Sequence, residues 1–194
     1  MIDFNSYSDN DLISMKTVVP VQMNLRSGDD YLEGVLKPTK ARDAYGLDVE
    51  YTVLEGKHTK RKLYGLLLIQ GETDGQKSMI EGRTMPFLKS VLNSALYLDP
   101  ADQSPAACER RKKELRDFDG MRFLAEIGIE KSKDAAYPDK NVVVRAITRD
   151  MPQCGGRPPV EQIGPTGRPT GETPGAPPPS APLPVPVHKP KSAS

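Results

Sequence analysis

Residues 47–69 read LDVEYTVLEGKHTKRKLYGLLLI, and this stretch decides the fold class. Apolar and polar residues alternate from Leu47 to Val53, which is the period-two pattern of a half-buried strand. Glu55-Gly56 interrupts the alternation, and residues 63–69 return as a second apolar strand. The stretch therefore predicts a β-hairpin with Tyr51 in the core.

The connection between these two strands is rich in basic and titratable side chains, namely Lys57, His58, Lys60, Arg61 and Lys62. A cluster of cations at a hairpin turn suits an anionic, chain-like ligand better than a small-molecule pocket. The alternative is a solvated turn, because lysine at strand edges also discourages aggregation.

Other segments show the same strand pattern. Alternation predicts strands at residues 17–26, 31–37, 121–130 and 141–148. Helical spacing predicts a helix that begins after an N-cap at Thr84 and stops at Asp99-Pro100, following a long polar connection over residues 71–82. Ser104-Pro105 predicts the start of a second, short helix. The resulting order is β-β-β-β-α-α-β-β.

This order favours a mainly β fold, a small oligonucleotide-binding (OB) type β-barrel with one or two inserted helices. An α+β sandwich and a different small barrel are the alternatives. The domain is expected over residues 15–151, after a flexible N-terminus at residues 1–14. Thirteen of the 19 prolines lie from Pro152 onward, so residues 152–194 are expected to form a disordered, Pro-rich tail.

Charge and cysteine content narrow the function classes. The body up to Met151 has a net charge of −1 and the tail +2, so any nucleic-acid role must depend on a local patch. Cys108 and Cys154 stand alone, and His58 and His188 lack ligand spacing, so no metal site or cofactor is predicted. No apolar run approaches the length of a membrane span, and the acidic N-terminus differs from a signal peptide. A cytoplasmic, soluble protein is expected.

Three segments together resemble a known family. They are YLEGVLKPTKARDAYGLDVEYTVLEGKHTKRKLYGLLLIQG, FLKSVLNSALYL and DFDGMRFLAEIGIEKSKDAAYPDKNVVVRAIT. The resemblance is to phage and prophage proteins described as single-stranded DNA-binding, with an OB-type fold. It covers about residues 17–150, and its matching positions are Val53 to Gly56, Arg61 to Leu63, Gly120, Phe123, Ala125, Ile127 to Lys131, and Asn141.

The resemblance implies binding of single-stranded DNA with little sequence preference, in phage or prophage replication or recombination. It supplies no catalytic residues. Its implied partners are single-stranded DNA and phage or host replication proteins, with no membrane, and the oligomeric state is left open. Many prokaryotic single-strand binders end in an acidic partner-recruiting tip, whereas this chain ends in a basic segment.

The residues themselves suggest a nucleic-acid site. The candidates for phosphate contact are Lys40, Arg42, Lys57, Lys60, Arg61 and Lys62, and the candidates for base stacking are Tyr45 and Tyr64. Tyr64 is expected to point outward if Leu63 and Leu67 point inward. For both tyrosines the alternative is packing or turn structure. Only 6% of the chain is aromatic, so few bases can stack. Binding is therefore expected to depend mainly on phosphate contacts and to weaken with salt.

The alternatives to a DNA-binding protein are a metal-dependent nuclease and a protein-interaction module. Asp48, Glu50 and Lys62 loosely match the acidic-plus-lysine set of metal-dependent nucleases, but alternate polar residues on an exposed sheet face produce this spacing by chance, so no enzyme is predicted. The second class is a non-catalytic protein-interaction or assembly module built on the same barrel. Its feature is the Pro-rich tail, with a passive spacer as the alternative. Separately, the basic run Arg110 to Lys113 on the short helix could wrap an anion, with a solvated surface as the alternative.

Overall fold

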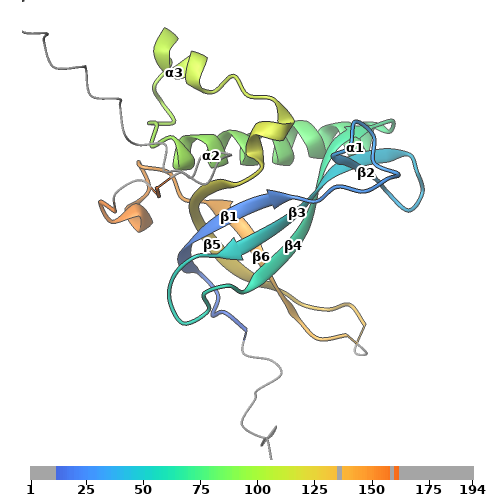
Figure 1. Ribbon diagram of the computed structural model, residues 1–194, viewed down its shortest axis with the longest axis horizontal. Helices are drawn as coiled ribbons and strands as arrows, with labels where there is room; N and C mark the ends of the chain where they lie inside the picture. The colour runs from blue at the N-terminus through green and yellow to red at the C-terminus, as the bar shows by residue number, and fades with distance from the viewer. Residues whose placement is uncertain (1–11, 135–136, 158–159, 162–194) are drawn as a thin grey trace, which may run out of the picture.

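The fold is mainly β, and the predicted order of strands and helices is confirmed (Figure 1). The computed structural model describes residues 12–134, 137–157 and 160–161. Their elements are β1 Thr17–Leu25, β2 Leu36–Pro38, β3 Ala44–Val53, β4 Lys62–Gly71, α1 Asp74–Met79, η2 Ile80–Thr84, α2 Met85–Ala95, α3 Pro105–Arg110, η3 Leu115–Phe118, β5 Met121–Glu130, β6 Lys140–Ala146 and η4 Pro152–Cys154.

Six strands in the described part of the chain form one antiparallel sheet. β1 lies between β3 and β5; β3 also pairs with β2 and β4, and β5 pairs with β6. β4 and β6 are the outermost strands of the order β4-β3-β1-β5-β6. They contact each other, but no β-ladder joins them within the described residues. Because every pairing is antiparallel, β4 and β6 both run in the direction of β1.

The strand directions place the connections at two opposite ends of the sheet. The β3–β4 connection, residues 54–61, and the described part of the β5–β6 connection, residues 131–134 and 137–139, lie at the end where β1 begins. Residues 26–35 and 39–43 lie toward the end where β1 finishes and β3 begins. In Figure 1 the first two connections point away from α2, which crosses the other end of the sheet.

The core follows from the alternation in the strands. Val21, Met23, Val49 and Phe123 are fully buried, as the period-two pattern requires. Tyr51 is also buried, as predicted, and its ring meets Phe123 edge to face with centroids 6.1 Å apart. Burial raises the pKa of the Tyr51 hydroxyl, which finds no hydrogen-bond partner in the described structure.

One helical stretch of 22 residues, from Asp74 to Ala95, replaces the long polar connection predicted for residues 71–82. That prediction was wrong because a capping box starts the helix despite Gly75. The Thr73 hydroxyl accepts from the backbone N–H of Gln76, while the Gln76 side chain accepts from that of Thr73. Thr84, the predicted N-cap, lies in αR conformation inside this stretch and makes no side-chain cap.

The second predicted strand is shorter than expected. Residues 31–35 form turns in which Gly34 N–H donates to the Tyr31 carbonyl and Val35 N–H to that of Leu32. Glu33 and Gly34 both have positive φ, which is incompatible with a strand. Only Leu36–Pro38 pairs with β3.

Helix α3 begins as predicted, since the Ser104 hydroxyl accepts from Ala107 N–H and Pro105 occupies the first turn. Two arginines at its end bind the preceding loop. Arg110 donates to the Leu96 carbonyl, and Arg111 donates to Asn93 Oδ1 and to the carbonyls of Asp99 and Asp102, at 2.7–3.0 Å. These bonds fasten α3 to the end of α2.

Asn141, one of the positions that carry the family resemblance, joins the start of the described chain to the sheet. Its side chain accepts from Ile13 N–H at 2.8 Å and donates to the carbonyls of Ile13 and Gly128. Ile13 itself is fully buried, two residues before the expected start of the domain. Most of the predicted flexible N-terminus and nearly all of the Pro-rich tail lie outside the described residues.

Candidate nucleic-acid interface

The β3–β4 hairpin presents the predicted cations at one end of the sheet. Its ladder ends at Thr52 and Lys62, and the chain turns through Gly56 and Lys60, which both have positive φ. Lys57, Lys60 and Lys62 are exposed and Arg61 is half-buried. The left-handed conformation of Lys60 closes the turn, and Lys60 N–H donates to the Val53 carbonyl. The cations of this loop therefore lie on an ordered hairpin.

Tyr64 is the most prominent aromatic group on the outer face of β3 and β4. It is 50% exposed, whereas its neighbour Leu63 is buried, which confirms the predicted outward orientation. The Arg26 guanidinium lies over the ring, 5.6 Å from its centroid, in a cation–π arrangement. Leu66, 45% exposed, extends the apolar surface along β4.

Asp48 lies on this face, where three groups from the segment that connects β1 to β3 cover it. Its carboxylate accepts from the Tyr31 hydroxyl at 2.7 Å and from Lys37 Nζ at 2.9 Å, and Arg26 Nη1 lies 3.7 Å away. Burial alone would raise the pKa of Asp48, but these hydrogen bonds and charges outweigh it and hold the pKa below its usual value. The carboxylate thus fixes the segment against β3.

Other polar groups of the outer face bond to one another, both across and along the strands. Lys62 Nζ lies 3.0 Å from Glu50, and the hydrogen bond raises the pKa of Lys62. Asn24 Nδ2 donates to Thr52 Oγ1, and Gln22 Nε2 donates to Asn24 Oδ1. Cation and carboxylate alternate here, so the face as a whole is not strongly positive.

The side chains that loosely matched a nuclease are therefore divided between two interactions. Asp48 binds the segment before β3, and Glu50 pairs with Lys62. Within the described residues, no group of three His, Cys, Asp or Glu side chains could hold a metal ion.

Lys40 and Arg42 lie at the other end of β3 from the hairpin cations. They occupy the turn before Ala44, and β3 has ten residues, so about 30 Å of strand separates the two groups. The predicted cations therefore bracket the β3–β4 face instead of forming one compact patch. Tyr45 is half-buried and packs against the hydrophobic core, which is the alternative foreseen for it.

Several side chains near this face were not predicted as site residues from the sequence. Arg26 follows β1, and only the register Asn24–Glu50–Tyr64 reveals that it reaches across β3. The β5–β6 connection adds exposed Lys131 and Lys133 and the 68% exposed Tyr137 at the hairpin end of the sheet. The motif KSKDAAYPDK, basic with one tyrosine, was the available signal for this second loop.

No protein-family model, curated protein or solved structure matches the chain. The resemblance to phage single-strand binders therefore stays a prediction, carried by the residues quoted for it. None of the helices in the described part of the chain combines the length and apolar character that crossing a bilayer requires.

Proposed function

We propose that the chain is an OB-type barrel that binds single-stranded DNA with little sequence preference. Two features of the fold support the barrel. The strand order β6-β5-β1-β3-β4 brings β6 and β4 into contact, and a helical segment is inserted between β4 and β5. Five strands in this order correspond to the partly open Greek-key barrel of OB domains.

OB barrels bind oligonucleotides on the face of their second and third strands, flanked by two loops. Here the corresponding strands are β3 and β4, with residues 26–43 on one side and residues 131–134 and 137–139 on the other. Lys40 and Arg42 belong to the first loop, and Lys131, Lys133 and Tyr137 to the second. The cations that bracket the face would then contact successive phosphates of one strand.

The observation that carries the proposal is the exposed ring of Tyr64 beneath Arg26 on the open β3–β4 face. A base stacked on such a ring contributes about 1–3 kcal/mol, and because every base has a π-face the contact is tolerant of sequence. The few exposed rings and the mixed charge of the face favour moderate affinity, and binding that depends mainly on phosphate contacts is steeply salt-dependent. The activity is binding, without catalysis, in replication or recombination of phage or prophage DNA in the cytoplasm.

Fluorescence anisotropy with a labelled single-stranded oligonucleotide tests the proposal. Titrations at about 50 mM and 200 mM salt, with duplex DNA and single-stranded RNA as competitors, separate the outcomes. The proposal predicts salt-sensitive binding to single strands in preference to duplex. A folded protein that fails to bind at the lower salt would refute it.

A second candidate function is partner binding without nucleic acid. The observation that favours it is an apolar groove with a cationic rim between α2 and α3, on the side of the molecule away from the hairpin.

A further inference from the structure

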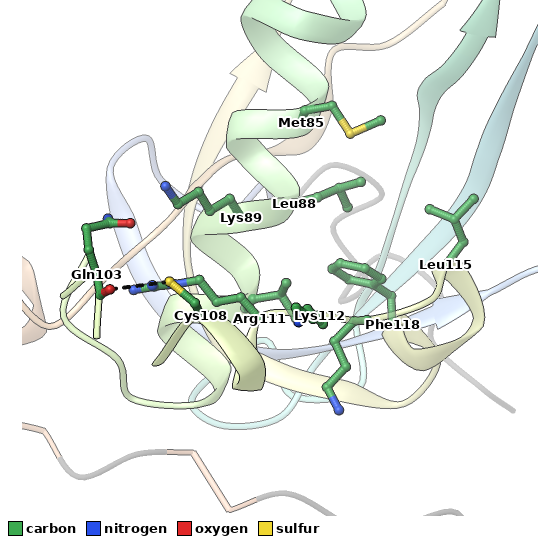
Figure 2. A pocket seen from close by; sticks show the side chains of 11 residues that line it. Met85, Leu88, Lys89, Gln103, Cys108, Arg111, Lys112, Leu115 and Phe118 are labelled. Atoms are coloured by element: carbon green, nitrogen blue, oxygen red, sulfur yellow. Dashed lines mark hydrogen bonds between the residues drawn. The ribbon is translucent and has the colours of Figure 1, made fainter. Parts of the chain in front are cut away.

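A groove of about 430 Å³ opens between α2 and the segment from α3 to η3 (Figure 2). Its floor is apolar: Leu88 and Leu92 from α2 and Phe118 from η3 are buried core residues, with Leu115 half-buried and Met85 exposed beside them. This volume lies within the range of about 300–1,000 Å³ that is usual for ligand-binding clefts.

The rim of the groove is cationic. Lys89, Lys112 and Lys113 are exposed on its edge, and no carboxylate is among the residues that line it. Lys112 pairs with Glu109 outside the groove, but both side chains are more than two-thirds exposed, so this pair exchanges readily for another. Lysines around an apolar floor are complementary to an apolar anchor flanked by carboxylates.

The walls of the groove are held in place without a ligand. Arg111 lies in the lining, yet its guanidinium is occupied by Asn93 and by the carbonyls of Asp99 and Asp102. Figure 2 shows Arg111 beside Cys108, whose thiol donates to the Gln103 carbonyl. A groove fixed in this way loses little entropy when a ligand binds.

We propose that this groove binds an acidic peptide segment of a partner protein, with one aromatic or large aliphatic side chain on the floor and its carboxylates paired with Lys89 and Lys113. The apolar floor favours a peptide over a nucleic acid, whose phosphates would gain nothing from Leu88 or Phe118. The groove lies beside α2 and α3, away from the hairpin cations at residues 57–62 (Figure 1), so a bound peptide would not cover those cations. The inference does not depend on the proposed DNA binding.

The test uses the fluorescein-labelled peptide Asp-Asp-Leu-Asp-Phe-Leu-Asp and a control in which every aspartate is lysine. The acidic peptide should bind the full chain and the basic control should not. Lys89→Glu with Lys113→Glu should weaken binding at least tenfold by removing the rim charge. Cys108→Trp should do the same by filling the groove from an exposed position, without disturbing the core.

The matched control is Lys16→Glu with Lys77→Glu, two exposed lysines outside the groove, which should stay within twofold of wild type. Alkylation of exposed Cys108 by N-ethylmaleimide offers a second readout, with buried Cys154 as an internal reference. The acidic peptide should slow the alkylation of Cys108, and saturating single-stranded DNA should not.

Three results would overturn the proposal. The first is the absence of peptide binding, or binding insensitive to both groove variants. The second is protection of Cys108 by DNA instead of peptide, which would assign the groove to nucleic acid. The third is faster alkylation of Cys108 after deletion of residues 1–11, a segment with three aspartates and Phe4, which would make the chain's own segment the occupant.

Discussion

Two basic regions of this molecule differ in what their charges do. The run Arg110 to Lys113 is the densest in the sequence, but its two arginines bind backbone carbonyls and Asn93 and hold α3 against α2. The cations around the β3–β4 face are spread over three segments of the sequence; among them, Arg26 lies over the exposed ring of Tyr64 and Lys62 pairs with Glu50. Charge density along a sequence therefore does not measure how much charge is available to a ligand.

The largest expected effect concerns the structural region. Arg111→Ala removes three hydrogen bonds and leaves buried Asn93 without its charged donor, so the free energy of unfolding should fall by about 2–3 kcal/mol. Urea denaturation measures it. Lys113→Ala, at an exposed neighbouring position, should change stability by less than about 0.5 kcal/mol. Equal effects of the two variants would remove the distinction between structural and available charge.

The next effect concerns the Asp48 carboxylate on the β3–β4 face. The folded pKa of Asp48 is lowered, so its stabilising effect is complete above the unfolded value of about 4 and is lost as the pH falls through the folded value. Asp48→Asn should lower the free energy of unfolding at pH 7 by about 1–2 kcal/mol and flatten its decline below pH 4.

The control for Asp48 is Asp30→Asn, an exposed residue of the same connection. It should leave both the free energy of unfolding and its pH dependence close to wild type. If Asp48→Asn and Asp30→Asn gave the same pH profile, Asp48 would not be the group that fixes residues 26–38 against β3.

The smallest effect concerns a single ring. Tyr64→Ala should weaken binding to single-stranded DNA about tenfold, because a stacked base is lost. Tyr64→Phe retains the ring and should bind within twofold of wild type. The ring is exposed, so neither change should destabilise the fold, and anisotropy at one salt concentration suffices. A tenfold loss for phenylalanine would instead assign the contact to the hydroxyl.

The strands were predictable because alternation reports directly on burial. Residues 121–130 match β5 to the residue, and Tyr51 and Tyr64 face the sides that the alternation predicts. The helix over residues 74–84 was missed because residues 71–82 are mostly polar and contain glycines, while the capping box from Thr73 to Gln76 starts the helix. Local hydrogen bonds outweighed glycine propensity there.

The candidate site was only partly predictable, for a different reason. The hairpin cations were visible because they are close in sequence. Arg26 was not, since its contact with Tyr64 depends on the pairing of three strands. Likewise, Lys40 and Arg42 were predicted as phosphate contacts without a position relative to the hairpin cations, and the length of β3 separates the two groups. Tertiary register decides such neighbours, and one sequence does not reveal it.

The most direct test compares the salt dependence of DNA binding after matched triple substitutions in the two regions. Lys60→Ala, Arg61→Ala and Lys62→Ala should weaken binding and reduce the magnitude of the slope of log affinity against log salt by about 2, as expected for three lost phosphate contacts to a single strand. Lys89→Ala, Lys112→Ala and Lys113→Ala should leave the slope unchanged. An unchanged slope for the hairpin variant, or equal reductions for both, would contradict the assignment of the β3–β4 face as the DNA-binding surface.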